Sequence, residues 1–192
     1  MTARGPWSLV YPGKRVYLKT LRPADVDVRT IAHSLANQCR FIGHVEQHYS
    51  VAQHCVHVSY LCDRVDAPWG LLHDGAEAYL GDVPRQIKHS PEMALFREWE
   101  ARVLGVICKR FGLQGEEPSS VKFADKVMLS VESNTLLQRD LIPKGWEKWD
   151  RMRDVYVSSH PDRALPDLTN PWSPKLSEKI FLDRFHFLFG AL

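Results

Sequence analysis

Residues 71–82 read LLHDGAEAYLGD, and four ionisable side chains interrupt this otherwise apolar stretch. They are His73, Asp74, Glu77 and Asp82. An isolated charge is costly to bury, so these groups must either stay in water or hold something that makes their burial tolerable. A helix is expected here from Pro68 to Gly81, because proline suits the first turn of a helix and glycine suits its end.

On such a helix, Glu77 lies four residues after His73 and three after Asp74. One histidine and two carboxylates would then border the same space. An imidazole nitrogen and a carboxylate oxygen from neighbouring positions can bind one divalent metal ion, with Glu77 left to handle protons. Two ligands do not complete a metal site, so the others must come from elsewhere in the chain.

The flanking sequence predicts further helices by its apolar spacing and its capping residues. Their expected extents are about Asp25 to Cys39 with Asp25 or Asp27 as the cap, a helix capped by Ser50, Pro91 to Gly112, Pro118 to about Leu141, and residues 176–189. We therefore expect an all-α fold in one domain of 192 residues. It divides into an extended N-terminal arm (1–24), which can form a hairpin edge, a helical core (25–141), and an aromatic-rich C-terminal extension (142–192). The Trp- and Pro-rich part of that extension is expected to form loops.

Charge and composition exclude several classes of protein. Lys and Arg total 25 against 23 Asp and Glu, which gives a net charge of +2, and no block of five or more like charges occurs. We therefore expect no nucleic-acid partner and no polybasic membrane tether. The first fifteen residues lack the apolar core of a signal peptide, and no run of 18 apolar residues occurs, so neither secretion nor membrane insertion is expected. Four scattered cysteines suit a reduced, cytoplasmic protein.

Two further residues can complete the metal site. The helix that begins after Ser50 carries His54, and the helix that follows Pro118 carries Asp125 within the apolar segment VKFADKVML. A lone carboxylate in such a setting needs a partner. Two imidazoles and two carboxylates suit Zn, Mn, Co or Mg among other divalent ions, and affinity order alone does not choose between them.

The order His54, His73-Asp74, Asp125 resembles that of the HD-domain metal-dependent phosphohydrolases, which are helical proteins named for the adjacent His-Asp pair. The segments SVAQHC and LLHDGAEAYLGDVP are similar to those of the bacterial 5′-deoxynucleotidase branch and of phage dATP triphosphohydrolases. The likeness covers approximately residues 31–134. It implies an HD-domain helical bundle.

The resemblance also implies roles for individual residues. His54, His73, Asp74 and Asp125 would bind the metal ion. Glu77 would activate or position water, and Asp82 would be a second acidic residue of the active site. An arginine upstream of the first ligand contacts phosphate in that branch, and Arg40 in NQCRFIGH is the candidate here. This chain has Phe41 where the nucleotidases have tryptophan.

Other residues are weaker candidates. Lys88 and Arg85 can line the phosphate entrance, and we assign Lys88 and Phe41 with Arg40 to substrate binding. Pro84 and Phe41 are candidates for excluding a ribose 2′-hydroxyl. The remaining candidates have more ordinary interpretations as structural or solvated side chains: His33, His44, His48, His57, Tyr49 and Tyr79.

The function expected from the resemblance is hydrolysis of deoxynucleoside phosphates. The best guess is a dATP triphosphohydrolase that releases deoxynucleoside and triphosphate, and a 5′-deoxynucleotidase acting on monophosphates is the alternative. A non-catalytic nucleotide-binding module is a third interpretation, against which Glu77 argues. The resemblance also implies a homo-oligomer, for which the Trp-rich segment is a candidate interface. Motifs of P-loop enzymes, zincins and zinc deaminases are absent from the sequence.

Overall fold

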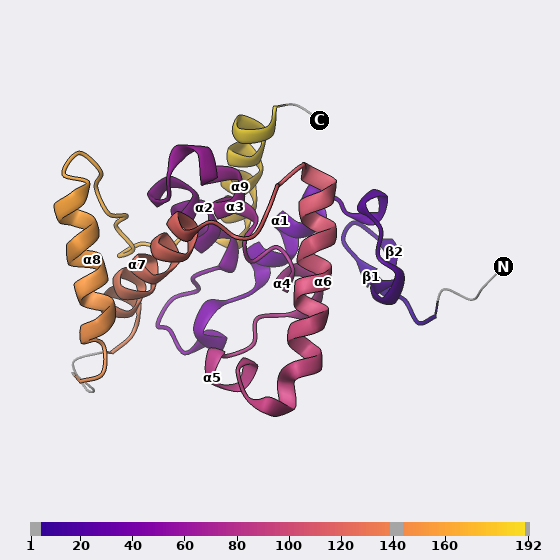
Figure 1. Ribbon diagram of the computed structural model, residues 1–192, viewed down its shortest axis with the longest axis horizontal. Coiled ribbons are helices and arrows are strands. Elements are labelled where there is room, and N and C mark those ends of the chain that lie inside the picture. The colour runs from indigo at the N-terminus through magenta and orange to yellow at the C-terminus, as the bar shows by residue number, and fades with distance from the viewer. Residues whose placement is uncertain (1–4, 139–143, 191–192) are drawn as a thin grey trace.

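The computed structural model describes residues 5–138 and 144–190, and these residues form a predominantly helical fold with one small β-hairpin (Figure 1). Strands β1 (Ser8–Val10) and β2 (Lys14–Val16) pair antiparallel, with Ser8 opposite Val16. Two short 3₁₀ turns follow, at Leu18–Thr20 and Pro23–Asp25. The predicted hairpin is therefore present in the N-terminal arm. Val16 is fully buried, so the hairpin is anchored to the core.

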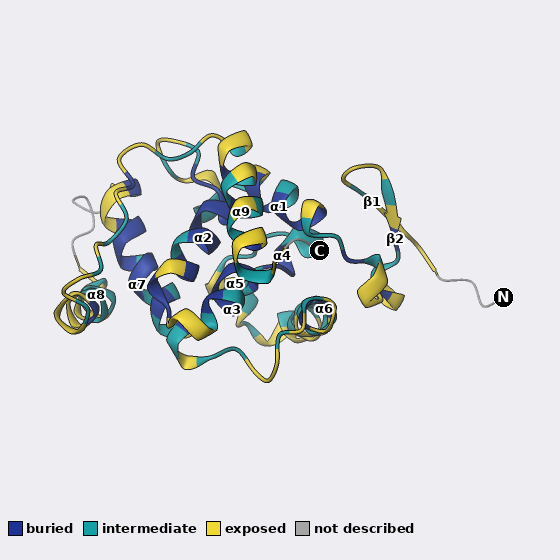
Figure 2. Cartoon of the chain, turned by 90° about the horizontal axis from the view of Figure 1, so that it is seen from above, coloured by how far each residue is buried: buried dark blue, intermediate teal, exposed yellow. Residues whose placement is uncertain are grey.

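Helices α1 (Val28–Asn37) and α2 (Val51–Leu61) begin where the sequence predicts. The Asp27 carboxylate accepts a hydrogen bond from the backbone of Arg29, and the Ser50 hydroxyl accepts one from Gln53 at 3.1 Å. Each side chain thereby satisfies a backbone N–H that has no partner within its helix. Helix α2 lies at the centre of the fold, where it contacts α1, α3, α7 and α9 (Figure 2).

The helix expected from Pro68 to Gly81 is interrupted, and this prediction was wrong. Helix α3 (Ala67–Leu72) and the short helix α4 (Glu77–Leu80) flank a turn at residues 73–76. Within the turn, Gly75 donates to the carbonyl of Leu72 at 2.9 Å, so the i to i−3 spacing replaces helical spacing. A Cβ at Gly75 would lie 2.9 Å from that same carbonyl oxygen, which explains why glycine occupies this position.

The later helices agree in part with those predicted from the sequence. After α5 (Arg85–Lys88) and a 3₁₀ turn at Pro91–Met93, helix α6 (Ala94–Phe111) ends at Gly112, whose φ of 74° is left-handed. Helix α7 (Ser119–Leu136) ends earlier than the expected Leu141, and residues 139–143 lie outside the described residues. The loops expected after Pro143 include a helix, α8 (Glu147–Ser159). Helix α9 (Pro174–Phe189) closes the chain as predicted.

Two apolar clusters form the core, and both contribute to placing the site. The first joins α1, α2, α3 and α6 to α9, whose Phe181 and Phe185 are fully buried. The second lies between α2, α3, α7 and α8, where the buried Tyr156 donates to the carbonyl of Leu61 at 3.1 Å. Helix α8 packs against α7 and exposes its outer side (Figure 2). Helices α2 and α3 thus pack against both clusters, and α7 packs against the second.

Candidate metal centre

Side chains from three elements converge between the two apolar clusters. His54 of α2, His73 and Asp74 of the turn after α3, and Asp125 of α7 meet at the Nε2 atom of His54. This atom lies 3.3 Å from His73 Nε2, 3.7 Å from Asp74 Oδ2 and 3.3 Å from Asp125 Oδ1. The four residues predicted from the sequence as metal ligands therefore share one small volume.

The spacing of these atoms suits a metal ion. Ligand atoms at about 2.1 Å from a tetrahedral metal lie about 3.4 Å from one another. One ligand atom each from His54, His73 and Asp74 lies within 4.8 Å of the other two, and His73 Nε2 and Asp74 Oδ2 are separated by 3.3 Å. His54, His73 and Asp74 can thus hold a metal ion, and Asp125 lies against the same nitrogen.

The second ring nitrogen of each histidine has its own partner. His73 Nδ1 donates to the carbonyl of Gly70 at 2.9 Å, and His54 Nδ1 lies 2.6 Å from Glu132 Oε1. A proton on Nδ1 leaves the lone pair of Nε2 facing the centre, which is the tautomer that a metal ligand needs. The surroundings therefore orient both rings for binding through Nε2.

Glu132 was missed by the sequence analysis. It is fully buried on α7, and its other oxygen accepts a hydrogen bond from Arg40 at 3.0 Å. Arg40 also lies 3.7 Å from Asp74. The available signal was the spacing of seven residues from Asp125 to Glu132, which places both carboxylates on one face of the helix. Glu132 thus links His54, a predicted metal ligand, to the predicted phosphate-binding arginine.

Opposite charges keep the carboxylates of the centre ionised. Burial alone would raise the pKa of Asp74, but the adjacent imidazoles of His73 and His54 and the guanidinium of Arg40 lower it well below its usual range. Burial likewise opposes ionisation of Glu132, yet Arg40 and His54 lower its pKa. The pKa of Asp125 is lowered mainly by its hydrogen bond to His54, again against the effect of burial. These acids therefore have the charged form that binds cations.

The pKa of Glu77 is shifted in the opposite direction. Burial, followed by the nearby charges of Asp74 and Asp82, raises the pKa of Glu77 to about 9. Its Oε2 atom is buried without a hydrogen-bond partner, and its Oε1 atom lies 3.8 Å from Lys88 Nζ. A carboxyl group with a raised pKa at a cavity is suited to accepting and releasing protons.

A cavity of about 660 Å³ opens beside this centre. Its lining includes all the predicted substrate-binding and catalytic residues together with Asp74 and Asp125. These are Arg40, Phe41, Glu77, Asp82 and Lys88, with Pro84, Arg85 and His44 also present. Lys88 is not available as an isolated cation, because its Nζ lies 2.6 Å from Glu100. The structure thus brings together the residues that the sequence analysis had assigned to one site.

Several weaker candidates lie away from the cavity lining. Tyr49 is fully buried. His33 pairs with Glu178 at 3.0 Å, and the ring of His57 lies 5.0 Å from that of Trp172. Their contacts match the structural interpretation of these side chains. Tyr79 and His48 also do not belong to the cavity lining.

The fold and the convergent side chains define a helical protein with a buried His-Asp centre that can hold a metal ion. The chain is similar to the uncharacterized protein YfdR of Escherichia coli K12, with 36% identity over 126 residues, or 66% of this chain and 70% of that protein. It is also similar to the uncharacterized protein RCAP_rcc00048 of Rhodobacter capsulatus, with 31% identity over 136 residues, or 66% of this chain and 69% of that protein. No model of a known protein family matches the sequence. The chain belongs to the family of YfdR and RCAP_rcc00048.

Proposed function

We propose that the protein is a metal-dependent phosphohydrolase of the HD-domain type that acts on deoxynucleoside phosphates. One observation carries the proposal: two imidazoles and two carboxylates converge beside a cavity that also contains several basic side chains and a buried carboxyl group with one oxygen that has no hydrogen-bond partner. A binding module needs the cations but has no use for a buried carboxyl group whose pKa is raised to about 9 beside the cavity.

His54, His73, Asp74 and Asp125 would hold the divalent ion, for which Zn, Mn, Co and Mg are the candidates. When bound, such an ion neutralises charge on phosphate and makes water more acidic. The separations of 3.3 to 3.7 Å around His54 Nε2 and the mixed nitrogen and oxygen ligands support this assignment.

Glu77 is the general base in this proposal, since the charge of a cation held at the neighbouring centre would lower its raised pKa and leave it as the carboxylate. Water attacks the α-phosphorus, the bond from phosphorus to the 5′ oxygen of the nucleoside breaks, and Glu77 takes the proton from water. The departing 5′ oxygen gains one proton, so the reaction is balanced as hydrolysis. Asp82 is proposed as the second acidic side chain, since it lines the same cavity and its charge raises the pKa of Glu77.

Arg40 would contact the phosphate chain. Glu132 and Asp74 hold the guanidinium at 3.0 Å and 3.7 Å, while its Nε atom has no hydrogen-bond partner and the residue lines the cavity. Arg85, His44 and His89 line the cavity as well, whereas Lys88 in the same lining is paired with Glu100. This number of basic groups favours a triphosphate over a monophosphate, so dATP is the first substrate to test.

The test is a product analysis with purified protein loaded with Mn, Co, Mg or Zn and incubated with each dNTP, NTP and dNMP. Deoxynucleoside and triphosphate from dATP would support the proposal, and phosphate released from monophosphates alone would make the protein a 5′-deoxynucleotidase. Release of no phosphate-containing product from any nucleotide would reject the proposed activity.

A Glu77→Gln variant separates catalysis from binding. It should retain nucleotide affinity and lose about 10²- to 10⁴-fold in turnover, which is the usual contribution of a general base. Glu178→Gln is the control, because it makes the same substitution at a carboxylate that pairs with His33 and lies outside the cavity lining. Equal turnover of Glu77→Gln and the control would contradict the role of Glu77.

The cellular setting and the assembly also stay proposals. All four cysteines are free, which suits a cytoplasmic protein, and none of the helices in residues 5–138 and 144–190 is long and apolar enough to cross a membrane. A homo-oligomer is expected from the resemblance, and light scattering tests it. Trp146 and Trp149 line the cavity, and Trp172 packs against the first apolar cluster, so each has contacts within its own chain.

A further inference from the structure

The cavity has a second, apolar region that the proposed chemistry does not use. Beyond the carboxylates and basic groups, its lining includes Ile42, Leu129, Leu137, Trp146 and Trp149. These apolar side chains offer no favourable interaction to a charged phosphate chain. A cavity that combines basic groups with aromatic and aliphatic side chains suits a ligand that is itself charged at one end and apolar at the other.

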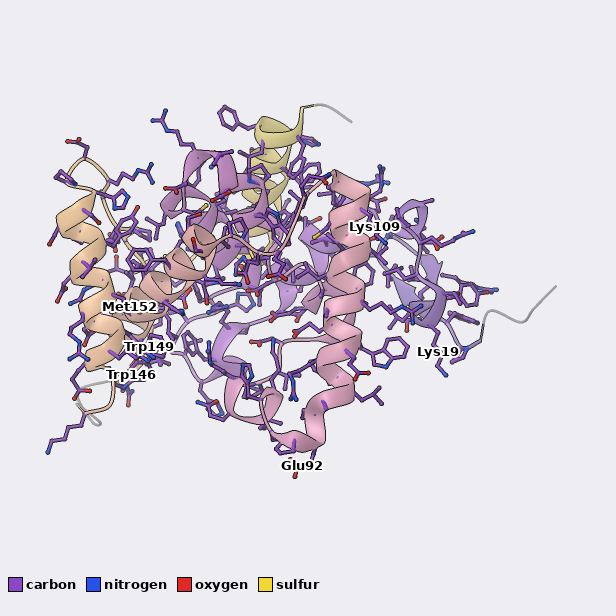
Figure 3. All side chains as sticks on the ribbon, viewed as in Figure 1. Lys19, Glu92, Lys109, Trp146, Trp149 and Met152 are labelled. Carbon is purple, nitrogen blue, oxygen red and sulfur yellow. The ribbon has the colours of Figure 1, made fainter. Side chains whose placement is uncertain are left out.

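Two tryptophans dominate this region. Trp146 caps the start of α8, and Trp149 follows three residues later, so both side chains lie on the same side of the first turn. Figure 3 shows both at the lower end of α8, the end nearest α5. Neither is buried in the apolar clusters. Half-buried indole rings beside a cavity provide flat surfaces on which an aromatic ligand can stack.

The backbone of a second segment of the lining is strained. Phe41 and Ile42 have φ angles of 56° and 53°, in the left-handed region that is disfavoured for residues with a side chain and most of all for a β-branched one. Ile42 is also 63% exposed, although it is apolar. Such strain persists only where the surrounding structure enforces it, and it is concentrated at functional sites. Here it presents an apolar side chain to the cavity next to Arg40.

We propose that Trp146, Trp149 and Ile42 form a nucleobase subsite, in which the base stacks on the indole rings while the phosphates extend toward Arg40 and the metal centre. This inference rests on the proposed function for the identity of the phosphate end. The larger ring system of a purine gains more from stacking on two indoles than a pyrimidine does, so the subsite favours deoxyadenosine and deoxyguanosine phosphates.

The test uses deoxyadenosine, which has no phosphate to hydrolyse, and inorganic triphosphate, which has no base. Deoxyadenosine titrated into metal-loaded, ¹⁵N-labelled protein should shift the indole N–H signals of Trp146 and Trp149. The six tryptophan signals are assigned with single Trp→Phe variants. Shifts at other tryptophans alone, or no shift at saturating deoxyadenosine, would overturn the subsite.

Binding measurements on variants of Trp149 test the proposal quantitatively. Trp149→Ala should weaken deoxyadenosine binding by about five- to hundredfold, the range found for base stacking on an aromatic side chain, and leave the affinity for inorganic triphosphate unchanged. Trp149→Phe keeps an aromatic ring and should restore most of the affinity, which guards against a folding defect. Trp7→Ala is the matched control, because Trp7 is 48% exposed and has Arg15 over its ring, as Trp149 has Lys148. Equal loss of deoxyadenosine and triphosphate affinity in Trp149→Ala would refute a base-specific role.

Measuring dATP hydrolysis in the same preparations separates the two proposals. Binding of deoxyadenosine at Trp146 and Trp149 without any hydrolysis would reject the phosphohydrolase and retain the subsite. Hydrolysis with an unchanged KM for dATP in Trp149→Ala would retain the enzyme and reject the subsite.

Discussion

Replacing Glu132 by glutamine should weaken metal binding although Glu132 is not itself a proposed ligand. The carboxylate accepts from His54 at 2.6 Å and from Arg40 at 3.0 Å, and it is fully buried. A glutamine side chain has one oxygen and one NH₂ group. Whichever way it turns, it can accept from only one of the two partners and points a donor at the other.

The expected magnitude follows from the bond that is lost. A hydrogen bond to a charged group contributes about 1.5–3 kcal/mol, and replacing an outer-shell partner of a metal-binding histidine usually costs about 10- to 100-fold in metal affinity, or about 1.4–2.7 kcal/mol. The two ranges agree. We therefore expect the metal Kd of Glu132→Gln to rise about 10- to 100-fold, with a loss of similar size in the free energy of unfolding of the metal-free protein.

The assay is competition with a chromophoric chelator for Co or Zn, paired with urea unfolding in excess chelator. Glu178→Gln is the control, since it changes a carboxylate that pairs with His33 at 3.0 Å away from the centre. Its metal Kd should stay within about twofold of that of the parent protein. A stability loss in Glu132→Gln with unchanged metal affinity would refute the reasoning, because Glu132 would then support the fold without orienting His54.

Three further predictions concern the fold. A Cβ at Gly70 would lie 2.9 Å from Cys62 Sγ and 3.0 Å from Ser59 Cα, so Gly70→Ala should lower the free energy of unfolding in urea by about 1–3 kcal/mol. A Cβ at Gly105 meets open space, so Gly105→Ala should raise the free energy of unfolding by about 0.5–1 kcal/mol. A change of the same sign in the two variants would contradict this packing. Burial lowers the pKa of His57 from 6.5 to about 4, so its contribution is fully present above pH 6.5 and is lost as the pH falls through the folded-state pKa. The stability difference between the parent and His57→Gln should therefore shrink by about 2 kcal/mol between pH 7.5 and pH 5, and a constant difference would show that the imidazole is not held neutral. Phe185→Ala should cost about 3–5 kcal/mol, because Phe185 is fully buried on α9, and a loss below about 1 kcal/mol would mean that α9 does not complete the core.

Local signals in the sequence were sufficient for most helix starts and for the helix end at Gly112. Ser50 and Asp27 cap their helices with hydrogen bonds inside the first turn, and Gly112 ends α6 in a left-handed conformation. Such features depend on a few neighbouring residues, so they can be recognised without the rest of the fold. The later helix α8 was missed because only Tyr156 is buried on it, which leaves little apolar periodicity to detect.

The metal centre, too, was predicted in part from the sequence and decided in part by the tertiary structure. The sequence alone determined which residue types are present at which spacing, and from these it predicted that His54, His73, Asp74 and Asp125 would meet. Only the tertiary structure decided how they meet: Gly75 closes the tight turn that carries His73 and Asp74, and the packing of α7 against α2 places Glu132 between His54 and Arg40. The physical reason is the distance along the chain over which each kind of interaction acts. Capping and turn chemistry act over three or four residues, whereas the contact between His54 and Glu132 joins positions 78 residues apart and exists only once the apolar clusters on both sides have formed.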